Sequence, residues 1–140
     1  MRIVFDPAAL HQSKKGSITA VVYFEFAAGQ QFPGLGWNDF VVVLAAWWVG
    51  VLHRVASGES GLQLRFMDGP YWITIIAQEN RLLLQCIEDR RGAGVVYEFT
   101  TNIDDLTSEV LAFACRVSEA CKAAAISSVD LDRLRAMLPN

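Results

Sequence analysis

Histidine and cysteine are scarce in this sequence, which has only His11, His53, Cys86, Cys115 and Cys121 among its 140 residues. None of these residues stands at the Cys-x-x-Cys, His-x-x-x-His or EF-hand spacing that is typical of metal sites. We therefore predict that the protein has no metal site and no cofactor. The odd number of cysteines, with the last two only six positions apart on a predicted helix, favours reduced core thiols of a cytoplasmic protein over a disulfide.

Charge is also in short supply, because only 19% of the residues are charged and the net charge is -3. Nucleic-acid-binding proteins usually carry a basic face, so we predict no direct contact with nucleic acid. The longest apolar run covers residues 40–52, interrupted only by Gly50, and is too short for the roughly 20 residues that cross a bilayer. With no secretory signal pattern at the start, the sequence predicts a cytoplasmic single domain over residues 1–140.

Strand patterns occur in two groups. Residues 2–5 and 17–28 are rich in β-branched and aromatic side chains, which indicates two strands separated by a polar loop at 11–16. Four more strands are predicted at residues 62–67, 71–78, 81–88 and 94–101. They are separated by turn signals at 68–70, 79–80 and 89–92, which is the pattern of an antiparallel meander.

Helices are predicted over residues 38–56, 102–125 and 128–137. Asn38 is the expected cap of the first, Asn102 with Asp105 of the second, and Ser127 with Asp130 of the third. The expected buried stripe of the first helix is Phe40, Val43, Leu44, Trp47, Val51 and Val55. Because the other side of that helix is also apolar, it needs cover on two sides, from a sheet and a second helix or from another chain.

The order of these elements predicts an α+β fold. We expect an antiparallel sheet of about five to six strands, with two longer helices and one short C-terminal helix packed against it. The pattern leaves the order of the strands open.

Catalytic patterns are weak throughout. A nucleophilic pair of Cys86 with His53 would need a thiol of low pKa, but Cys86 lies in an apolar strand that indicates a core thiol. Gly34 and Gly36 lack the third glycine of a dinucleotide-binding fingerprint. We therefore predict that the protein is not an enzyme.

Four tryptophans stand out in a chain of this length. Trp47 and Trp72 are predicted to lie in the core. Trp37 and Trp48 cannot both share the helix face of Trp47, so one or both are predicted to be exposed, where tryptophan commonly marks an interface.

A longer pattern of aromatic and turn residues covers residues 30–75. It reads Phe32-Pro33-x-x-x-Trp37-x-Asp39-Phe40, then an apolar helix with Trp47-Trp48, then Phe66-Met67-Asp68-Gly69-Pro70-Tyr71. This order resembles small bacterial immunity proteins that are encoded beside polymorphic or contact-dependent growth-inhibition toxins. The resemblance implies a cytoplasmic protein that binds the C-terminal domain of one toxin tightly and blocks it, with no catalytic residues of its own.

The net negative charge of the chain is compatible with that resemblance. Many such toxins are nucleases and hold phosphates in basic sites, which an acidic inhibitor would complement in charge. Together with Trp37 and Trp48, seven carboxylates are the predicted partner-binding residues: Asp68, Glu79, Glu88, Asp89, Asp104, Asp105 and Glu109. Successive hairpin turns lie at opposite ends of a sheet, so Glu79 should lie opposite Asp89. The sequence does not choose between the two ends.

Two other functions remain open. The apolar helix at residues 38–56 also suits a structural or adaptor protein that forms a homodimer. A tryptophan-lined concavity on an α+β sheet would instead suit a small-ligand-binding domain.

Overall fold

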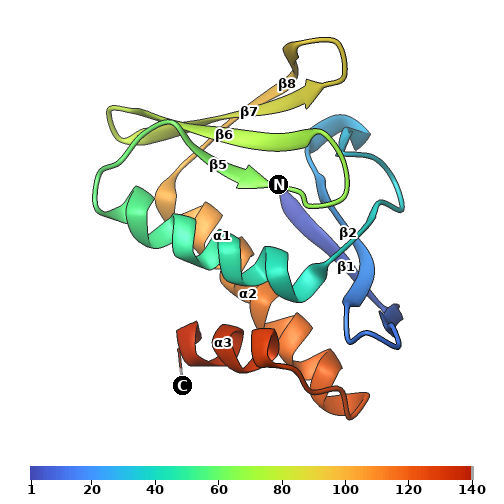
Figure 1. The fold of residues 1–140 in the computed structure, drawn as a ribbon. Helices are drawn as coiled ribbons and strands as arrows, with labels where there is room; N and C mark the ends of the chain where they lie inside the picture. Colours follow the sequence, from blue (N-terminus) through green and yellow to red (C-terminus); the bar gives the residue numbers. More distant parts are fainter. Residues whose placement is uncertain (140) are drawn as a thin grey trace.

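The computed structural model describes residues 1–139, which form three α-helices and two antiparallel sheets of four strands each (Figure 1). The predicted α+β class is therefore confirmed. The strands are divided between two sheets, whereas the sequence pattern suggested one sheet of about five to six strands. Short pairings at residues 31–32 and 38–39 add strands that no strand-like pattern marks.

The first sheet is built around one central strand. Its members are β1 (Arg2–Gln12), β2 (Ile18–Glu25), β3 (Gln31–Phe32) and β4 (Asn38–Asp39). Strand β2 pairs with β1 on one side and with β3 and β4 on the other. Strand β1 extends well beyond the predicted residues 2–5 and includes His11, which was expected in a loop. It tolerates Pro7 because it is an edge strand whose register shifts between Asp6 and His11.

The second sheet is the meander that the turn signals predicted. Its members are β5 (Leu62–Arg65), β6 (Tyr71–Gln78), β7 (Arg81–Asp89) and β8 (Ala93–Thr101), paired in that order. Gln78 pairs with Arg81, so Glu79 and Asn80 form the predicted two-residue turn. The next turn follows Asp89 at the other end of β7. Glu79 and Asp89 therefore lie at opposite ends of the sheet, as predicted.

The first helix starts later than its sequence pattern suggested. Helix α1 (Val41–Ala56) has Phe40 at its N-cap position, and Phe40 has no side-chain group that accepts a hydrogen bond. Asn38 was expected to cap the helix, but it belongs to β4 and pairs with Val21 of β2. Strand pairing thus takes precedence over local capping at this boundary.

The two C-terminal helices begin at well-formed caps. In α2 (Ile103–Ala123) the Asp105 amide donates to Asn102 Oδ1 at 2.8 Å, and Asn102 Nδ2 donates to Asp105 Oδ2 at 3.0 Å. This is the predicted reciprocal arrangement. In α3 (Val129–Met137) the cap is Ser128 rather than the expected Ser127, because the hydroxyl of Ser128 accepts from the Leu131 amide.

Helix α1 lies at the centre of the molecule, in contact with β2 and β5 and with both other helices (Figure 1). Its buried residues are Val41, Val42, Leu44, Ala45, Trp48, Val49, Leu52 and Val55. Of the predicted stripe, Leu44 and Val55 are buried, Phe40, Val43 and Val51 are half-buried, and Trp47 is exposed, so the prediction was wrong for Trp47. The chain itself covers α1 on two sides, and Trp47 is the large apolar side chain of this helix that stays exposed.

Strand β1 is attached to α2 through side chains. The Ile3 amide donates to Glu109 Oε1 at 2.7 Å, and Arg116 Nη2 donates to the Ile3 carbonyl at 2.8 Å. These bonds satisfy backbone groups on a strand edge that has no neighbouring strand. Across the described residues, no helix is both long and apolar enough to cross a bilayer.

Candidate partner-binding surface

The motif that carries the family resemblance forms a junction inside the protein. Asp39 is only 1% exposed. Its Oδ2 atom accepts hydrogen bonds from Trp37 Nε1 at 3.0 Å and from the amides of Met67 and Asp68 at 3.1 Å each. Its Oδ1 atom accepts from the Phe40 amide at 2.7 Å. One buried carboxylate thus joins β4 to the turn between β5 and β6.

Aromatic rings from both halves of the motif complete this junction. Phe32 and Trp37 pack edge to face on Tyr71, with ring centroids 5.8 Å and 5.1 Å apart. Gly69 has a φ of +133°, and a Cβ there would lie 2.9 Å from the Trp37 ring, so only glycine fits. The motif therefore has a structural role. Trp37 is half-buried, and its indole N–H already has an internal partner.

The adjacent tryptophans of α1 have the opposite environments to those predicted. Trp48 is fully buried, packs against Phe24, Phe66 and Phe113, and donates from Nε1 to the Arg65 carbonyl at 2.9 Å. Trp48 is therefore a core residue, and its prediction as an interface residue was wrong. Trp47 is 46% exposed, although it was expected in the core.

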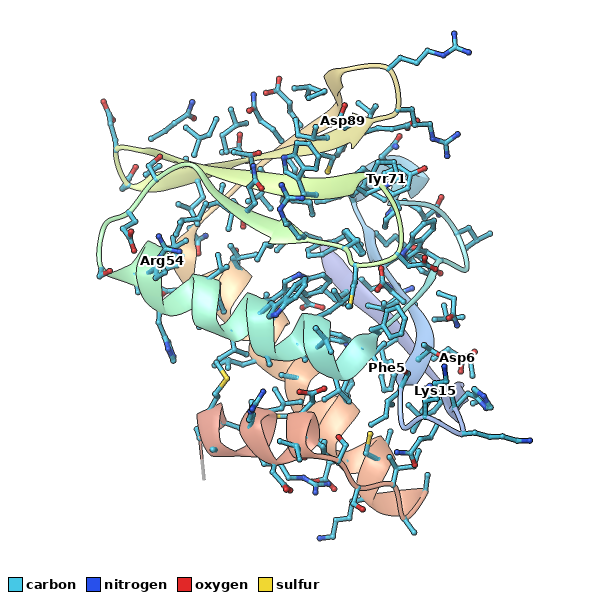
Figure 2. All side chains as sticks on the ribbon, in the orientation of Figure 1. Phe5, Asp6, Lys15, Arg54, Tyr71 and Asp89 are labelled. Carbon is cyan, nitrogen blue, oxygen red and sulfur yellow. The ribbon has the colours of Figure 1, made fainter. Side chains whose placement is uncertain are left out.

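The structure separates the seven candidate carboxylates into two groups. One group comprises Glu79, Asp104, Asp105 and Glu109, and lies around the β6–β7 turn and the first turns of α2. The other comprises Asp68, Glu88 and Asp89, and lies at the opposite end of the second sheet. Figure 2 shows Asp89 at that end, far from Arg54 near the end of α1.

The group at α2 lines two neighbouring hollows. Glu79 and Asp104 line a hollow of about 470 Å³, and Asp105 and Glu109 line one of about 250 Å³. Among the described lining residues, Arg81 is the one basic side chain. Asp105 and Glu109 also hold structure together, through the cap of α2 and the bond to Ile3. Glu79 and Asp104 are therefore the carboxylates most available to a partner.

The opposite end is closer to electrical balance. Glu88 pairs with Arg90 Nε at 2.9 Å, and Arg90 also donates to the Tyr71 hydroxyl. Arg91 follows directly in the same loop. The Asp89 amide donates to the Pro70 carbonyl at 2.9 Å, which brings the two turns of this end together. Its three carboxylates are thus offset by two arginines.

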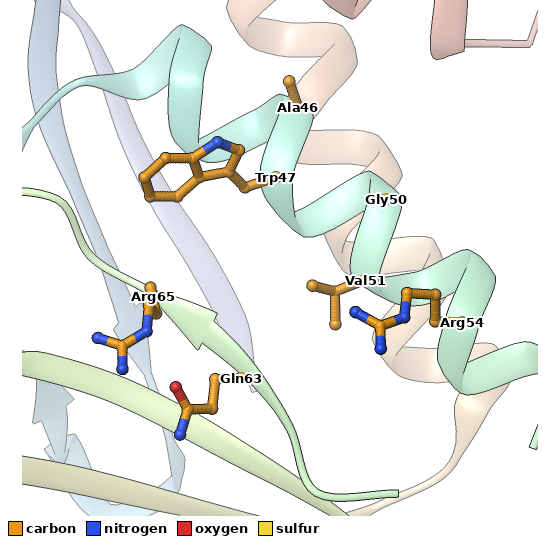
Figure 3. Close-up of a pocket in the computed structure, with 7 residues that line it drawn as sticks. All are labelled: Ala46, Trp47, Gly50, Val51, Arg54, Gln63 and Arg65. Carbon is orange, nitrogen blue, oxygen red and sulfur yellow. The ribbon is translucent and has the colours of Figure 1, made fainter. Parts of the chain in front are cut away.

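A groove runs between α1 and β5 (Figure 3). Its volume is about 530 Å³, and its lining residues are Ala46, Trp47, Gly50, Val51, Arg54, Gln63 and Arg65. In Figure 3, Trp47, Val51 and Arg54 project from α1 toward the strand that carries the other two side chains. This groove was not predictable from the sequence pattern alone, because it exists only after α1 packs beside β5. The alternation of apolar and polar residues over 62–65 was the one available signal.

The cysteines and histidines offer little for catalysis. Burial raises the pKa of the Cys86 thiol to about 12, and it also raises the pKa of Cys121. A thiol of such high pKa is a poor nucleophile at neutral pH, which weighs against the Cys86–His53 pair. Cys115 is exposed, so its prediction as a core thiol was wrong. Residues 1–139 contain no group of histidines, cysteines and carboxylates arranged to hold a metal ion.

These environments predict selective thiol labelling. In the native protein a disulfide-exchange reagent should modify Cys115 alone, and all three thiols should react after unfolding. Absorbance of the released thiol measures the stoichiometry. A Cys115→Ser variant is the control and should stay unreactive until it unfolds. Rapid native-state labelling of this variant would contradict the burial of the other two thiols.

The chain matches no protein-family model, and neither the curated proteins nor the solved structures include a match to it. Its function is therefore inferred from its residues and their arrangement.

Proposed function

We propose that this protein is an immunity protein that binds a cognate toxin domain and neutralises it by stoichiometric protein–protein inhibition. The proposed target is a nuclease domain with a basic substrate site. Support comes from the aromatic and turn motif, which resembles such proteins. Further support comes from the carboxylates gathered at the start of α2.

The observation that carries the proposal is the pair of neighbouring acidic hollows. Glu79 comes from a β-turn and Asp104 from a helix 25 positions later in the chain, yet both line one hollow. Carboxylates grouped in this way produce a negative potential, which attracts a basic surface from a distance and orients it. A nuclease site that holds phosphates offers such a surface.

Co-purification tests the proposal directly. The chain would be co-expressed with the C-terminal domain of any large protein that is encoded beside it, with the tag on that domain only. We expect a one-to-one complex that survives gel filtration and in which the toxin's activity is lost. If both proteins fold and no complex forms, the proposal is wrong.

Charge reversal tests which end of the molecule meets the toxin. Replacement of Glu79 and Asp104 by lysine should lower the association rate constant about tenfold or more at low salt. The deficit should shrink at high salt, because ions screen exposed charges. Stopped-flow fluorescence at several salt concentrations measures both effects.

The matched control reverses Asp68 and Asp89 at the opposite end, where arginines already offset the carboxylates. This control should associate nearly as fast as the unmodified protein. If the control slows association more than the Glu79/Asp104 variant does, the acidic hollows are not the site of steering.

A further inference from the structure

Strand β5 has a free edge. It is the first strand of its sheet and pairs only with β6. In an antiparallel pair, successive residues turn their backbone groups alternately toward the partner strand and away from it. The Phe66 amide bonds to the Tyr71 carbonyl of the facing segment, whereas the Arg65 carbonyl accepts from Trp48 on the other side. By this alternation, the N–H of Arg65 and both backbone groups of Gln63 face away from β6.

These free backbone groups border the groove beside α1. Trp47 and Val51 supply its apolar helix side, and Trp47 is 46% exposed. From Trp47 to Arg54 a helix rises about 10 Å, which is the length of about three residues of an extended strand. The groove therefore fits a short extended segment laid along β5.

The two sides of such a segment would meet different surroundings. Alternate side chains of a strand point to opposite faces of its sheet. One set would pack on Trp47 and Val51, so we expect these side chains of the segment to be apolar. The other set would lie beside Gln63 and Arg65, whose side chains share the face away from Leu64.

The charge of Arg65 favours acidic residues among the side chains of the segment that would lie beside Gln63 and Arg65. The guanidinium of Arg65 lies over the Trp72 ring, 4.8 Å from its centroid. Within residues 1–139 it forms no ion pair with a carboxylate. Arg54, at the far end of the groove, is already neutralised by a two-bond contact with Glu59, in which both distances are 2.9 Å. Arg65 is therefore the free cation that an acidic side chain of the segment would meet.

We propose that the free edge of β5 binds an extended segment of the partner protein by β-strand addition. This segment alternates apolar residues, placed on Trp47 and Val51, with acidic residues placed beside Arg65. The inference deepens the proposed function, because it names the part of the toxin domain that the chain holds. Its test uses peptides instead of the toxin, so either proposal can fail alone.

The groove and the hollow of Glu79 and Asp104 both reach the C-terminal part of α1. Arg54 lines the groove, and the next two residues, Val55 and Ala56, line the hollow of Glu79 and Asp104. A single partner would therefore be able to contact both surfaces. The charge pattern that fits them is a basic substrate site flanked by a strand with acidic side chains.

The experiment is a titration of the ¹⁵N-labelled protein with two capped peptides. One alternates glutamate with valine, and the other alternates lysine with valine. We expect saturable shifts of the Gln63 and Arg65 amides and of the Trp47 indole with the glutamate peptide, and at least about tenfold weaker binding of the lysine peptide. If neither peptide binds, or if the shifts lie elsewhere, the proposal is overturned.

A matched pair of variants isolates the backbone contact. Gln63→Pro removes an N–H that faces away from β6, a position at which an edge strand tolerates proline, while Gln63→Thr keeps that N–H. Proline should abolish peptide binding, and threonine should retain it. Equal binding by both variants would overturn strand addition.

Two further measurements keep the test decisive. Arg65→Glu should invert the preference between the two peptides, and an unchanged preference would contradict the assigned charge. Sedimentation of the unmodified protein measures its oligomeric state, and so tests whether a second copy of this chain occupies the groove instead. A dimer that becomes monomeric with Gln63→Pro would overturn the assignment of the groove to a partner protein. A monomer supports it.

Discussion

Replacement of Trp48 by alanine should lower the free energy of unfolding by about 3–5 kcal/mol, because it removes a large side chain from a close-packed core. The ring is fully buried among Phe24, Phe66 and Phe113, and its N–H bonds to the Arg65 carbonyl. A cavity and an unpaired carbonyl would remain. Urea denaturation followed by far-UV circular dichroism measures the loss, which is a large part of the 5–15 kcal/mol typical of a domain.

Trp47 provides a control at the next position. Because Trp47 is 46% exposed, its replacement by alanine should cost no more than about 1 kcal/mol. Trp48→Phe should fall between the two, since it retains an aromatic ring and loses the hydrogen bond. A larger cost for Trp47→Ala than for Trp48→Ala would contradict the orientation of α1.

Replacement of Asp39 by asparagine should lower the free energy of unfolding by about 2–4 kcal/mol, although the shapes of the two side chains are nearly the same. The carboxylate accepts four hydrogen bonds from N–H donors, spread over both of its oxygens. An amide group has one accepting oxygen, and its NH₂ would face at least one of these donors. The turn between β5 and β6 would then lose its attachment to β4.

Hydrogen exchange reports on this junction residue by residue. In Asp39→Asn the amides of Met67 and Asp68 should exchange much faster than in the unmodified protein, because their acceptor is weakened. Trp37→Phe removes only one donor and should cost about 1 kcal/mol. Wild-type stability and exchange in Asp39→Asn would show that the carboxylate does not hold the turn.

The parts of the fold that local chemistry determines were predictable from the sequence. The turns at residues 79–80 and 89–92 and the cap at Asn102 depend on neighbouring residues, and the meander and α2 were located correctly on that basis. The face of α1 was not predictable, because a helix that is apolar nearly all round has no unique buried side. Only packing against β5 and α2 decides that Trp48 turns inward.

Some features of the candidate site were likewise predictable from the sequence, and others were not. Acidic residues could be listed from the sequence, and the opposition of Glu79 to Asp89 followed from hairpin geometry. That Asp104 shares a hollow with Glu79 depends on how α2 meets the β6–β7 turn, which no local pattern encodes. The motif of residues 30–75 suggested a recognition surface, yet much of it closes around a buried carboxylate at Asp39.

The bonds between Ile3 and α2 have a consequence for biosynthesis. Their partners, Glu109 and Arg116, lie 106 and 113 positions further along the chain. A growing polypeptide emerges from the ribosome with its N-terminal segments first. While α2 is still inside the exit tunnel, the edge of β1 and the side of α1 that packs on α2 have no cover. These surfaces therefore stay exposed late in synthesis, and the fold closes around them only after α2 has left the tunnel.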